Sequence, residues 1–212
     1  MTVSWANARK KGIGGSDASA VLGLNPYMTN VELWKLKTGR KQKEDISNKD
    51  VVIYGNKLEP VLIDLFEADN QDYEIIDKEE ARKNKFHNFI YHNKYKFLLA
   101  NLDGVIRNKN TNELGVLEIK TCQLNQYNFS KWKDTIPINY YCQVLHYLNV
   151  TNYSYAFLYA LLKHQDFLEV KKYKILKNEV QEEIDNLQNK EIEFWTKYVE
   201  KDIEPNLLIN LN

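Results

Sequence analysis

Apolar residues recur with helical spacing in three long stretches of the chain. The first stretch, residues 50–67, predicts a helix that buries the stripe Val51, Tyr54, Leu58, Leu62 and Leu65. Pro60 is expected to kink this helix or to begin its second part. The second stretch predicts a helix that buries Tyr140, Tyr141, Val144, Leu145 and Leu148. The third predicts a long C-terminal helix within residues 177–201.

Two shorter helices are predicted near the N-terminus. Two glycines precede Ser16, a residue type that caps helix N-termini, and a short Ala-rich segment follows it. Thr29 or Asn30 is expected to cap a second helix over residues 31–37. We therefore expect residues 1–45 to form a helical lobe laid against a larger body.

Segments rich in β-forming residues alternate with the long helices. The stretches FLLANLDGVIRN and VLEIKT, joined by NKNTNELG, predict an antiparallel hairpin. Further strands are expected at about residues 153–161 and 168–173. This order of elements favours a central mixed β-sheet flanked by helices, in the α/β or α+β class. Without internal repeats or linkers, residues 1–212 are expected to form one domain.

The second hairpin strand, LGVLEIKTCQ, carries two opposite charges in its middle. Strand side chains alternate between faces, so Glu118 and Lys120 are expected on one face and Leu117 and Ile119 on the other. One interpretation is a half-exposed antiparallel strand with a solvated salt bridge. The other is a strand whose polar face carries chemistry.

A third charged residue, Asp103, ends the first hairpin strand and is expected to meet Glu118 and Lys120 at one end of the sheet. Two adjacent carboxylates repel each other unless a cation lies between them, and Mg²⁺ accepts such hard oxygen ligands. A lysine on the same face would orient or help deprotonate metal-activated water. Glu59, on the preceding helix, is a further candidate ligand or orienter of metal-bound water; the alternative is a surface glutamate before a proline.

Composition narrows the class of protein. A hydrophobic fraction of 43% and an aromatic fraction of 12% are typical of a packed globular chain. No run of 18 apolar residues exists and the N-terminus lacks the apolar core of a signal peptide, so we expect a cytoplasmic protein without a membrane span. Cys122 and Cys142 are expected to be reduced, and two cysteines do not build a four-cysteine zinc or iron–sulfur site.

The charge balance argues against a strongly basic nucleic-acid binder, because Lys+Arg and Asp+Glu both total 29. Positive charge gathers in one segment, WKLKTGRKQK, which contains Lys35, Lys37, Arg40, Lys41 and Lys43. This basic cluster is either a solvated face or part of a path for DNA.

Four segments of the chain resemble, in order, the motifs of the lambda-exonuclease-like, YqaJ-type viral recombinases of the PD-(D/E)XK nuclease superfamily. They are IGGSDASAVLGLNPY with the following ELW, then GNKLEP, then LDG…LEIKT, and finally IPINYYCQVLHYLNVT. The resemblance covers roughly Trp5 to Tyr159 and implies a PD-(D/E)XK restriction-endonuclease-like fold.

The resemblance also implies a catalytic core. It makes Asp103 and Glu118 direct metal ligands, with the backbone carbonyl of Ile119 completing the protein's coordination. It makes Lys120 the catalytic lysine and Glu59 a supporting acid near the metals, acting either as a ligand or through water.

A second implied site binds the terminal 5′-phosphate. Arg9 and Ser16 correspond to phosphate-holding residues, and Gln143 to the glutamine that borders the same pocket. Trp5 is expected to pack beneath Arg9. The residues alone favour a mobile N-terminal side chain for Arg9. They give Ser16 the rival role of helix cap, which is compatible with phosphate binding because a helix N-terminus attracts anions. One position departs from the family pattern: Asn101 stands where a serine is common.

The implied activity is a Mg²⁺-dependent exonuclease that degrades one strand of double-stranded DNA from a 5′-phosphorylated end, with two metal ions and with Mn²⁺ as a substitute. It would release 5′-mononucleotides and leave 3′ tails for a single-strand annealing protein in phage or prophage recombination within a bacterial host, as a homotrimer. Alternatives are an endonuclease or helicase-associated nuclease on the same core, and a non-catalytic DNA-binding protein.

Overall fold

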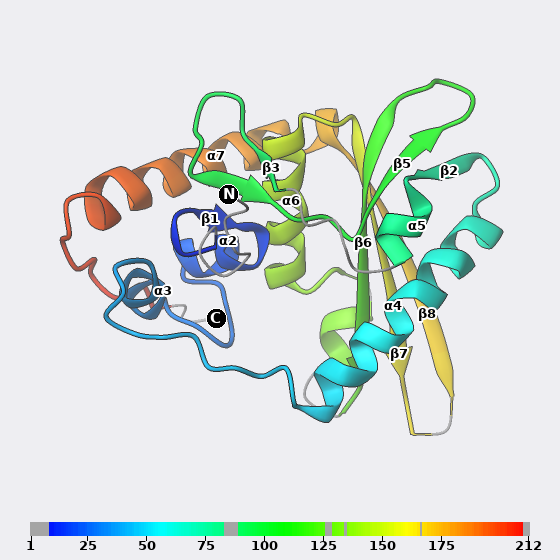
Figure 1. Ribbon diagram of the computed structural model, residues 1–212, viewed down its shortest axis with the longest axis horizontal. Helices are drawn as coiled ribbons and strands as arrows, with labels where there is room; N and C mark the ends of the chain where they lie inside the picture. Colours follow the sequence, from blue (N-terminus) through cyan, green and yellow to red (C-terminus); the bar gives the residue numbers. More distant parts are fainter. Residues whose placement is uncertain (1–8, 83–88, 126–128, 134, 166, 210–212) are drawn as a thin grey trace.

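Two β-sheets organise the chain, as a computed structural model shows for residues 9–82, 89–125, 129–133, 135–165 and 167–209 (Figure 1). Trp5 lies outside the described residues. The larger sheet has the order β2, β5, β6, β7, β8, with bounds Tyr73–Ile76, Gly104–Asn108, Leu114–Gln123, Tyr155–Lys163 and Leu168–Leu176. The smaller sheet has the order β1, β4, β3, with bounds Ile13–Gly14, Leu98–Ala100 and Ile90–Tyr91.

The α-helices are α2 Gly15–Val21, α3 Asn30–Lys37, α4 Asp50–Asp69, α5 Lys78–Arg82, α6 Ile138–Thr151 and α7 Gln181–Glu193. A π-helical segment, Phe194–Val199, continues α7, and 3₁₀ turns occupy Phe129–Trp132 and Lys177–Glu179. The predicted α/β class with a mixed sheet and flanking helices is confirmed. The N-terminal lobe is not purely helical, because β1 pairs in parallel with β4.

Strand β6 lies in the middle of the larger sheet. It pairs antiparallel with β5 and parallel with β7, and α6 makes the crossover that a parallel pair requires. Glu118 in its middle is only 1% exposed. The interpretation of a half-exposed strand with a solvated salt bridge is therefore wrong.

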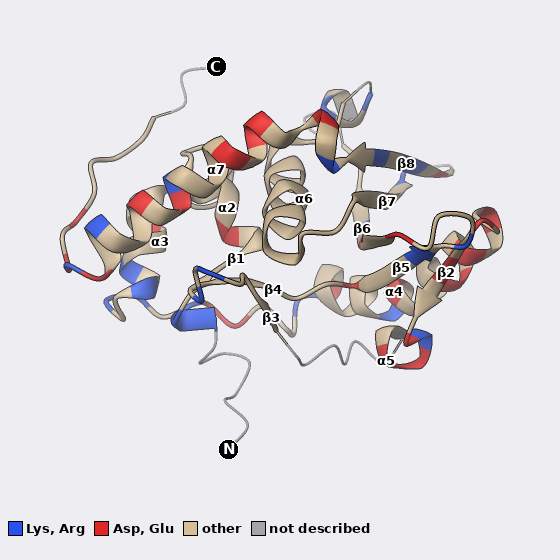
Figure 2. Ribbon diagram, turned by 90° about the horizontal axis from the view of Figure 1, so that it is seen from above, with Lys and Arg blue, Asp and Glu red and all other residues tan. Residues whose placement is uncertain are grey.

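Helices cover both faces of the larger sheet, so each face has its own apolar core. On one face, Leu62, Ile63 and Phe66 of α4 pack against a cluster that includes Leu117 and Ile119. On the other face, α6 packs against a larger cluster that also takes in residues of α2, α3 and α7. Figure 2 shows α6 lying between the N-terminal lobe and the larger sheet.

The buried stripe expected along α4 is wrong at three of its five positions. Val51 is 71% exposed and Tyr54 49% exposed, and Leu65 also reaches solvent. The helix runs unbroken through Pro60, and Leu62, Ile63 and Phe66 of its C-terminal half pack into an apolar cluster on the sheet. Helical periodicity identified the helix, but the neighbouring sheet determines which face is buried.

Two expectations from composition can be compared with the structure. Cys122 and Cys142 are free thiols, as expected. Across the described part of the chain, no helix has both the length and the apolar character that a bilayer span requires.

Candidate active site

The hairpin register brings two carboxylates together. Gly104 pairs with Leu117, so Asp103 lies next to Glu118 at the start of β5. Asp103 Oδ2 accepts a hydrogen bond of 2.8 Å from the backbone N–H of Ile119. The expected first hairpin strand is broken here: β4 ends at Ala100 in the smaller sheet, and Asp103 belongs to the link before β5 rather than to a strand end.

Glu118 is buried among hydrogen-bond donors, but one of its oxygens has none. Its Oε1 accepts from the Lys120 ammonium and, at 2.6 Å, from Gln143 Nε2. Its Oε2 is buried with no hydrogen-bond partner among the described residues. Burial, reinforced by the charge of Asp103, raises the pKa of Glu118 to about 8.

Lys120 remains a cation in this environment. Burial alone would lower its pKa, but the carboxylates of Glu118 and Asp103 outweigh that effect and raise it. Its ammonium also lies 5.4 Å from the ring centroid of Tyr140. The predicted face of β6 thus carries a carboxyl group and a lysine ammonium in contact.

Glu59 is the third carboxylate of the site. It is half-buried on α4, and burial, followed by the charge of Asp103, raises its pKa to about 8, while Lys120 acts in the opposite sense. An ordinary surface glutamate would not show this. Glu59 therefore lies within electrostatic range of Asp103 and Lys120, and its role as a ligand or orienter of water stays a prediction.

The donor set fits a divalent cation. Among the described residues no group of three His, Cys, Asp or Glu side chains has metal-binding geometry, so the fit rests on fewer side chains. Asp103 and Glu118 are two adjacent carboxylates, one oxygen of Glu118 lacks a partner among the described residues, and the charge of Asp103 disfavours ionisation of Glu118. Mg²⁺ is commonly bound by one or two carboxylates and completes its shell with water.

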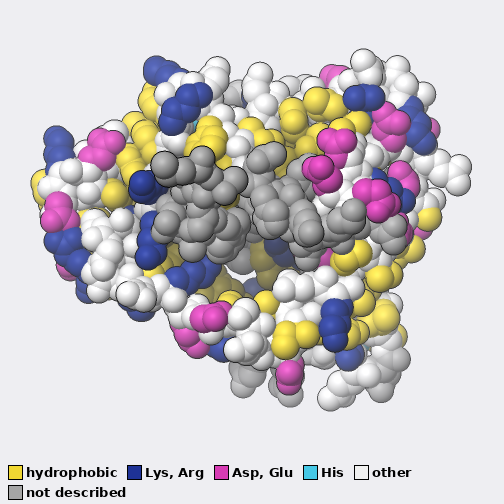
Figure 3. Space-filling view, viewed as in Figure 1, with side chains coloured by type: hydrophobic (Ala, Val, Ile, Leu, Met, Phe, Trp, Pro, Cys, Tyr) yellow, Lys and Arg dark blue, Asp and Glu magenta, His cyan; other side chains and the backbone are white. Residues whose placement is uncertain are grey.

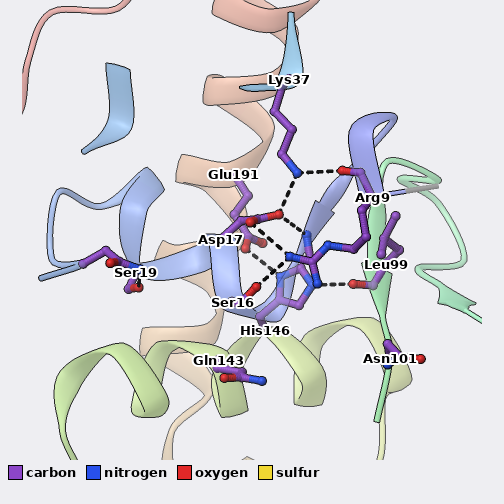
Figure 4. Close-up of polar contacts among 12 residues, drawn as sticks. Arg9, Ser16, Asp17, Ser19, Lys37, Leu99, Asn101, Gln143, His146 and Glu191 are labelled. Atoms are coloured by element: carbon purple, nitrogen blue, oxygen red, sulfur yellow. Dashed lines mark hydrogen bonds and ion pairs between the residues drawn. The ribbon is translucent and has the colours of Figure 1, made fainter. Parts of the chain in front are cut away.

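A pocket of about 410 Å³ lies beside this core, on the side of the N-terminal lobe. Its lining is rich in cations and hydrogen-bond donors and includes Arg9, Ser16, Lys37, Lys43 and Gln143. Figure 4 shows Arg9, Asp17 and Lys37 converging, with Ser16 beside them and Gln143 on the neighbouring helix. All three residues predicted for phosphate binding therefore line one pocket.

Arg9 is fixed in place rather than extended into solvent. Its Nη2 donates to Ser16 Oγ at 2.6 Å and to Asp17 Oδ1 at 3.2 Å, and its side chain is only 18% exposed. The interpretation of Arg9 as a mobile side chain is wrong. Ser16 is not the helix cap either: Gly14 occupies the cap position of α2, and Ser16 lies in the first turn. At the next helix, Thr29 caps α3 as expected.

Asp17 is the residue of this pocket that the sequence analysis missed. Its Oδ2 accepts from Lys37 Nζ at 2.7 Å and from the backbone N–H of Gly14 at 3.0 Å, in addition to the contact with Arg9. Burial acts to raise the pKa of Asp17, but the two cations overcome it and hold the pKa well below its usual range. The available signal was an acid three residues after a helix-capping glycine.

Gln143 joins the pocket to the carboxylates. The same Nε2 that donates to Glu118 lies 3.0 Å from the hydroxyl of Tyr147, one helical turn further along α6. Tyr147 in turn donates to the backbone carbonyl of Asn101 at 2.9 Å. Tyr147, the second residue that was missed, connects α6 to the segment that carries Asp103.

The basic cluster is largely neutralised within the protein. Lys37 pairs with Asp17, Arg40 with Asp202 and Lys41 with Glu32. Three lysines of the cluster, Lys37, Lys41 and Lys43, line the pocket. On the face drawn in Figure 3, Lys and Arg side chains gather to one side of a hollow, between the region of α3 and the first turns of α4.

The fold and the carboxylate–lysine strand define a PD-(D/E)XK-type architecture. A crystal structure of an alkaline exonuclease from Laribacter hongkongensis superposes with a TM-score of 0.61 at 14% identity, over 94% of this chain and 93% of that one. The same enzyme in complex with dAMP matches with a TM-score of 0.59 at 13% identity, over 93% and 92%.

The family follows from the sequence. The model of the YqaJ-like viral recombinase domain matches residues 4–154, and the chain belongs to this family. The uncharacterized protein YqaJ of Bacillus subtilis (strain 168) is 35% identical over 198 residues, which is 92% of this chain. The chain spans 56% of that relative's length.

Proposed function

We propose that the chain is a divalent-metal-dependent deoxyribonuclease that degrades one strand of duplex DNA from its 5′ end. The observation that carries this proposal is the connection between two sites. A buried carboxylate–lysine core on β6 and a cationic pocket on the lobe are linked through Gln143. An enzyme that starts at a phosphorylated end uses both, because an anchored end determines which phosphodiester reaches the core.

Asp103, Glu118 and the backbone carbonyl of Ile119 are the proposed ligands of Mg²⁺, and Glu59 is proposed to act through water. We propose two ions, with Mn²⁺ as a substitute. The unpartnered Glu118 Oε2 and the raised pKa values of the carboxylates support a cation here. When bound, such ions supply an activated water and stabilise the leaving 3′-oxygen.

The other side chains bind and orient. Lys120 is held as an ammonium, so in this state it donates hydrogen bonds to water and phosphate oxygens rather than accepting a proton. Arg9 presents a guanidinium, suited to phosphate oxygens, next to the Ser16 hydroxyl. Gln143 borders the same pocket and at the same time holds Glu118.

The comparisons support the finer parts of the proposal. The family is described as a viral recombinase domain, and the structural neighbour is an alkaline exonuclease whose dAMP complex agrees with a mononucleotide product. We therefore propose that the chain leaves 3′ single-stranded tails for a single-strand annealing protein in phage or prophage recombination, in the bacterial cytoplasm. A homotrimer and a single nuclease domain over residues 1–212 complete the proposal.

The deciding experiment is a time course on linear duplex DNA beside closed circular DNA, with Mg²⁺. Linear DNA with 5′-phosphates is expected to release mononucleotides and to retain its 3′ label until late, while circular DNA stays intact. Equal cleavage of circular DNA would point to an endonuclease. If neither Mg²⁺ nor Mn²⁺ supports cleavage, the nuclease proposal fails and the alternative of a non-catalytic DNA-binding protein replaces it.

A variant separates chemistry from binding. Lys120→Ala is expected to abolish cleavage while duplex binding in Ca²⁺ stays within about threefold of wild type, because Lys120 lies in the core and not in the pocket. If the variant still cleaves, Lys120 is not the catalytic lysine.

A further inference from the structure

The pocket beside the core holds more positive charge than the protein neutralises. Arg9, Lys37 and Lys43 act on one another there, and Asp17 is the carboxylate that faces them. Lys10 and Lys41 also line the pocket, and Lys41 pairs with Glu32. Among the three cations that act on one another, the one carboxylate leaves two positive charges. A terminal phosphomonoester carries about −1.5 to −2 at neutral pH, whereas an internal phosphodiester carries about −1.

Two of the three cations are already engaged. Arg9 donates to Ser16 and Asp17, and Lys37 donates to Asp17 Oδ2 and to the backbone carbonyl of Arg9, both at 2.7 Å. The Lys37 side chain is 5% exposed, so its ammonium is part of the frame that fixes Arg9.

Lys43 differs from both. It lines the pocket, yet within the described part of the chain its ammonium has neither a hydrogen bond nor an ion pair. Although the residue as a whole is exposed, the protein around its amine desolvates it in part. This desolvation, and then the charge of Arg9, lower the pKa of Lys43, which an anion between the two would reverse.

We propose that Lys43 is the specificity-determining cation of this pocket, which selects a terminal 5′-phosphomonoester over an internal phosphodiester. The inference rests on the proposed function, since it takes DNA ends as the ligand. Arg9 with Ser16 holds the phosphate through fixed donors, and Lys43 supplies the second positive charge that only a dianion matches. Of the three lysines of the basic segment that line the pocket, Lys37 and Lys41 are paired with carboxylates and Lys43 is not, within the described part of the chain.

Lys41 provides a matched control. It lines the same pocket two residues away, but its ammonium pairs with Glu32 at 3.0 Å at a position where both side chains are about half exposed. Lys43→Gln and Lys41→Gln therefore remove the same charge from the same segment. Neither lysine belongs to an apolar core, so both variants are expected to fold, which thermal melting checks.

The test uses the full 212-residue chain and two duplexes that differ only in a 5′-phosphate or a 5′-hydroxyl. Binding is measured in Ca²⁺ by fluorescence anisotropy, and initial cleavage rates in Mg²⁺. Lys43→Gln is expected to reduce the preference for the phosphorylated end by about tenfold, the size of a lost charge-assisted hydrogen bond. Lys41→Gln is expected to change it by less than about twofold. Lys43→Arg should restore most of the preference.

A pH series adds a readout that a merely structural role would not move. As pH rises through the second pKa of the phosphate, about 6, the wild-type preference should grow, and it should grow less in Lys43→Gln. Equal weakening of both duplexes by Lys43→Gln would make Lys43 a general backbone contact and overturn the proposal. An unchanged preference for the phosphorylated end in Lys43→Gln would overturn the proposal as well.

The binding arm separates this inference from the proposed activity. If wild type cleaves neither duplex but binds the phosphorylated one better, and Lys43→Gln removes that difference, the nuclease proposal fails and the role of Lys43 stands. If wild type cleaves with a 5′-phosphate preference that Lys43→Gln retains, the nuclease proposal stands and the role of Lys43 fails.

Discussion

Asp17 lies at the meeting point of three donors from separate parts of the lobe. Arg9 precedes β1, Gly14 caps α2, and Lys37 ends α3, and all three donate to the one buried carboxylate. Removing one partner of a buried ion pair leaves the remaining charges uncompensated, which costs about 3–5 kcal/mol. An exposed pair contributes far less, because water and salt screen it. The two cases can be compared within this chain.

We expect Asp17→Asn to lower the free energy of unfolding by about 3 kcal/mol, measured by urea denaturation at pH 7. Asp202→Asn makes the same change in an exposed pair, where Arg40 donates twice to Asp202, and should have a much smaller effect. Similar losses in the two variants would show that Asp17 is not the organising charge of the lobe.

The Asp17 contribution also has a defined pH range. Because the pKa of Asp17 is held below its ordinary value of about 4, its stabilisation is fully present above that pH and is lost as pH falls further. The difference in stability between wild type and Asp17→Asn should therefore shrink only in acid, below about pH 4.

Single residues were predictable where their neighbours in sequence explain them. Glu118 and Lys120 stand out because strand alternation places two charges on one face of an apolar segment. Asp17 did not stand out, since acids in a first helical turn are common on surfaces. Its burial depends on Lys37, 20 residues away, and a contact at that separation leaves no local pattern.

Helix α6 connects the two halves of the site at the scale of elements. Gln143 holds Glu118, Tyr147 holds the carbonyl of Asn101, and His146 contacts the carbonyl of Leu99 at 3.0 Å. Three residues within about one helical turn therefore position β6 and the segment that leads into Asp103.

Tyr147→Phe tests this positioning role. We expect the affinity for Mn²⁺, measured by calorimetry without DNA, to fall by about tenfold, because Asn101 loses its donor and Asp103 is held less firmly. Tyr155→Phe is the control: its hydroxyl also donates to a backbone carbonyl, that of Glu113, the residue before β6, at 3.3 Å. Equal losses of metal affinity would mean that the effect is general destabilisation.

His146 and Glu191 fasten α6 to α7 through a buried ion pair. Both are 0% exposed, with His146 Nδ1 2.6 Å from Glu191 Oε1, and both ring nitrogens face acceptors, so the ring is doubly protonated. Burial acts to lower the pKa of His146, but Glu191 and the Leu99 carbonyl raise it.

A histidine whose pKa is raised by folding stabilises the protein fully at pH values below its pKa in the unfolded chain, about 6.5. This stabilisation is lost as pH rises through its pKa in the folded protein. We therefore expect the gap in unfolding free energy between wild type and Glu191→Gln to narrow from pH 6 to pH 9. Taking the difference between the two proteins cancels the carboxylates of the active site, which titrate in the same range. Parallel pH curves would contradict a charged pair.

The buried face of a helix was predicted well where its apolar residues lie on one side, and poorly where the packing partner determines which side is buried. The helix at Ile138–Thr151 buries the predicted residues Val144, Leu145 and Leu148. In α4, the same spacing rule selected Val51 and Tyr54, which are exposed, whereas Leu62, Ile63 and Phe66 face the apolar cluster on the sheet. Strand β1, with two residues, is too short to leave a periodic signal.

At the scale of the whole molecule, the site lies where the lobe meets the larger sheet. The lobe supplies Arg9, Asp17 and Lys43, the sheet supplies Asp103 and Glu118, and α6 lies between them (Figure 2). One apolar core includes residues from the lobe, α6, β7 and α7, which supports the proposal of a single domain. No single segment of the sequence contains this arrangement, because it arises only when the lobe packs on α6.

A cation bound only by the folded chain should stabilise the whole molecule. At a concentration 100 times its dissociation constant, such a ligand adds about 2.7 kcal/mol, and a chain of this size melts about 2–4 °C higher for each kcal/mol. We expect Mg²⁺ to raise the melting temperature by about 5–10 °C, and EDTA to reverse the rise. Ions that interact only with the surface would give a much smaller shift.

Two variants, Glu118→Gln and Glu74→Gln, show where the ion binds. The first replaces a carboxylate whose Oε2 has no partner among the described residues, whereas Glu74 pairs with Arg107 near the edge of the sheet. Comparing each protein with and without Mg²⁺ removes differences in baseline stability. We expect the shift to disappear in Glu118→Gln and to persist in Glu74→Gln. A shift that survives in both would place the ion away from Asp103 and Glu118.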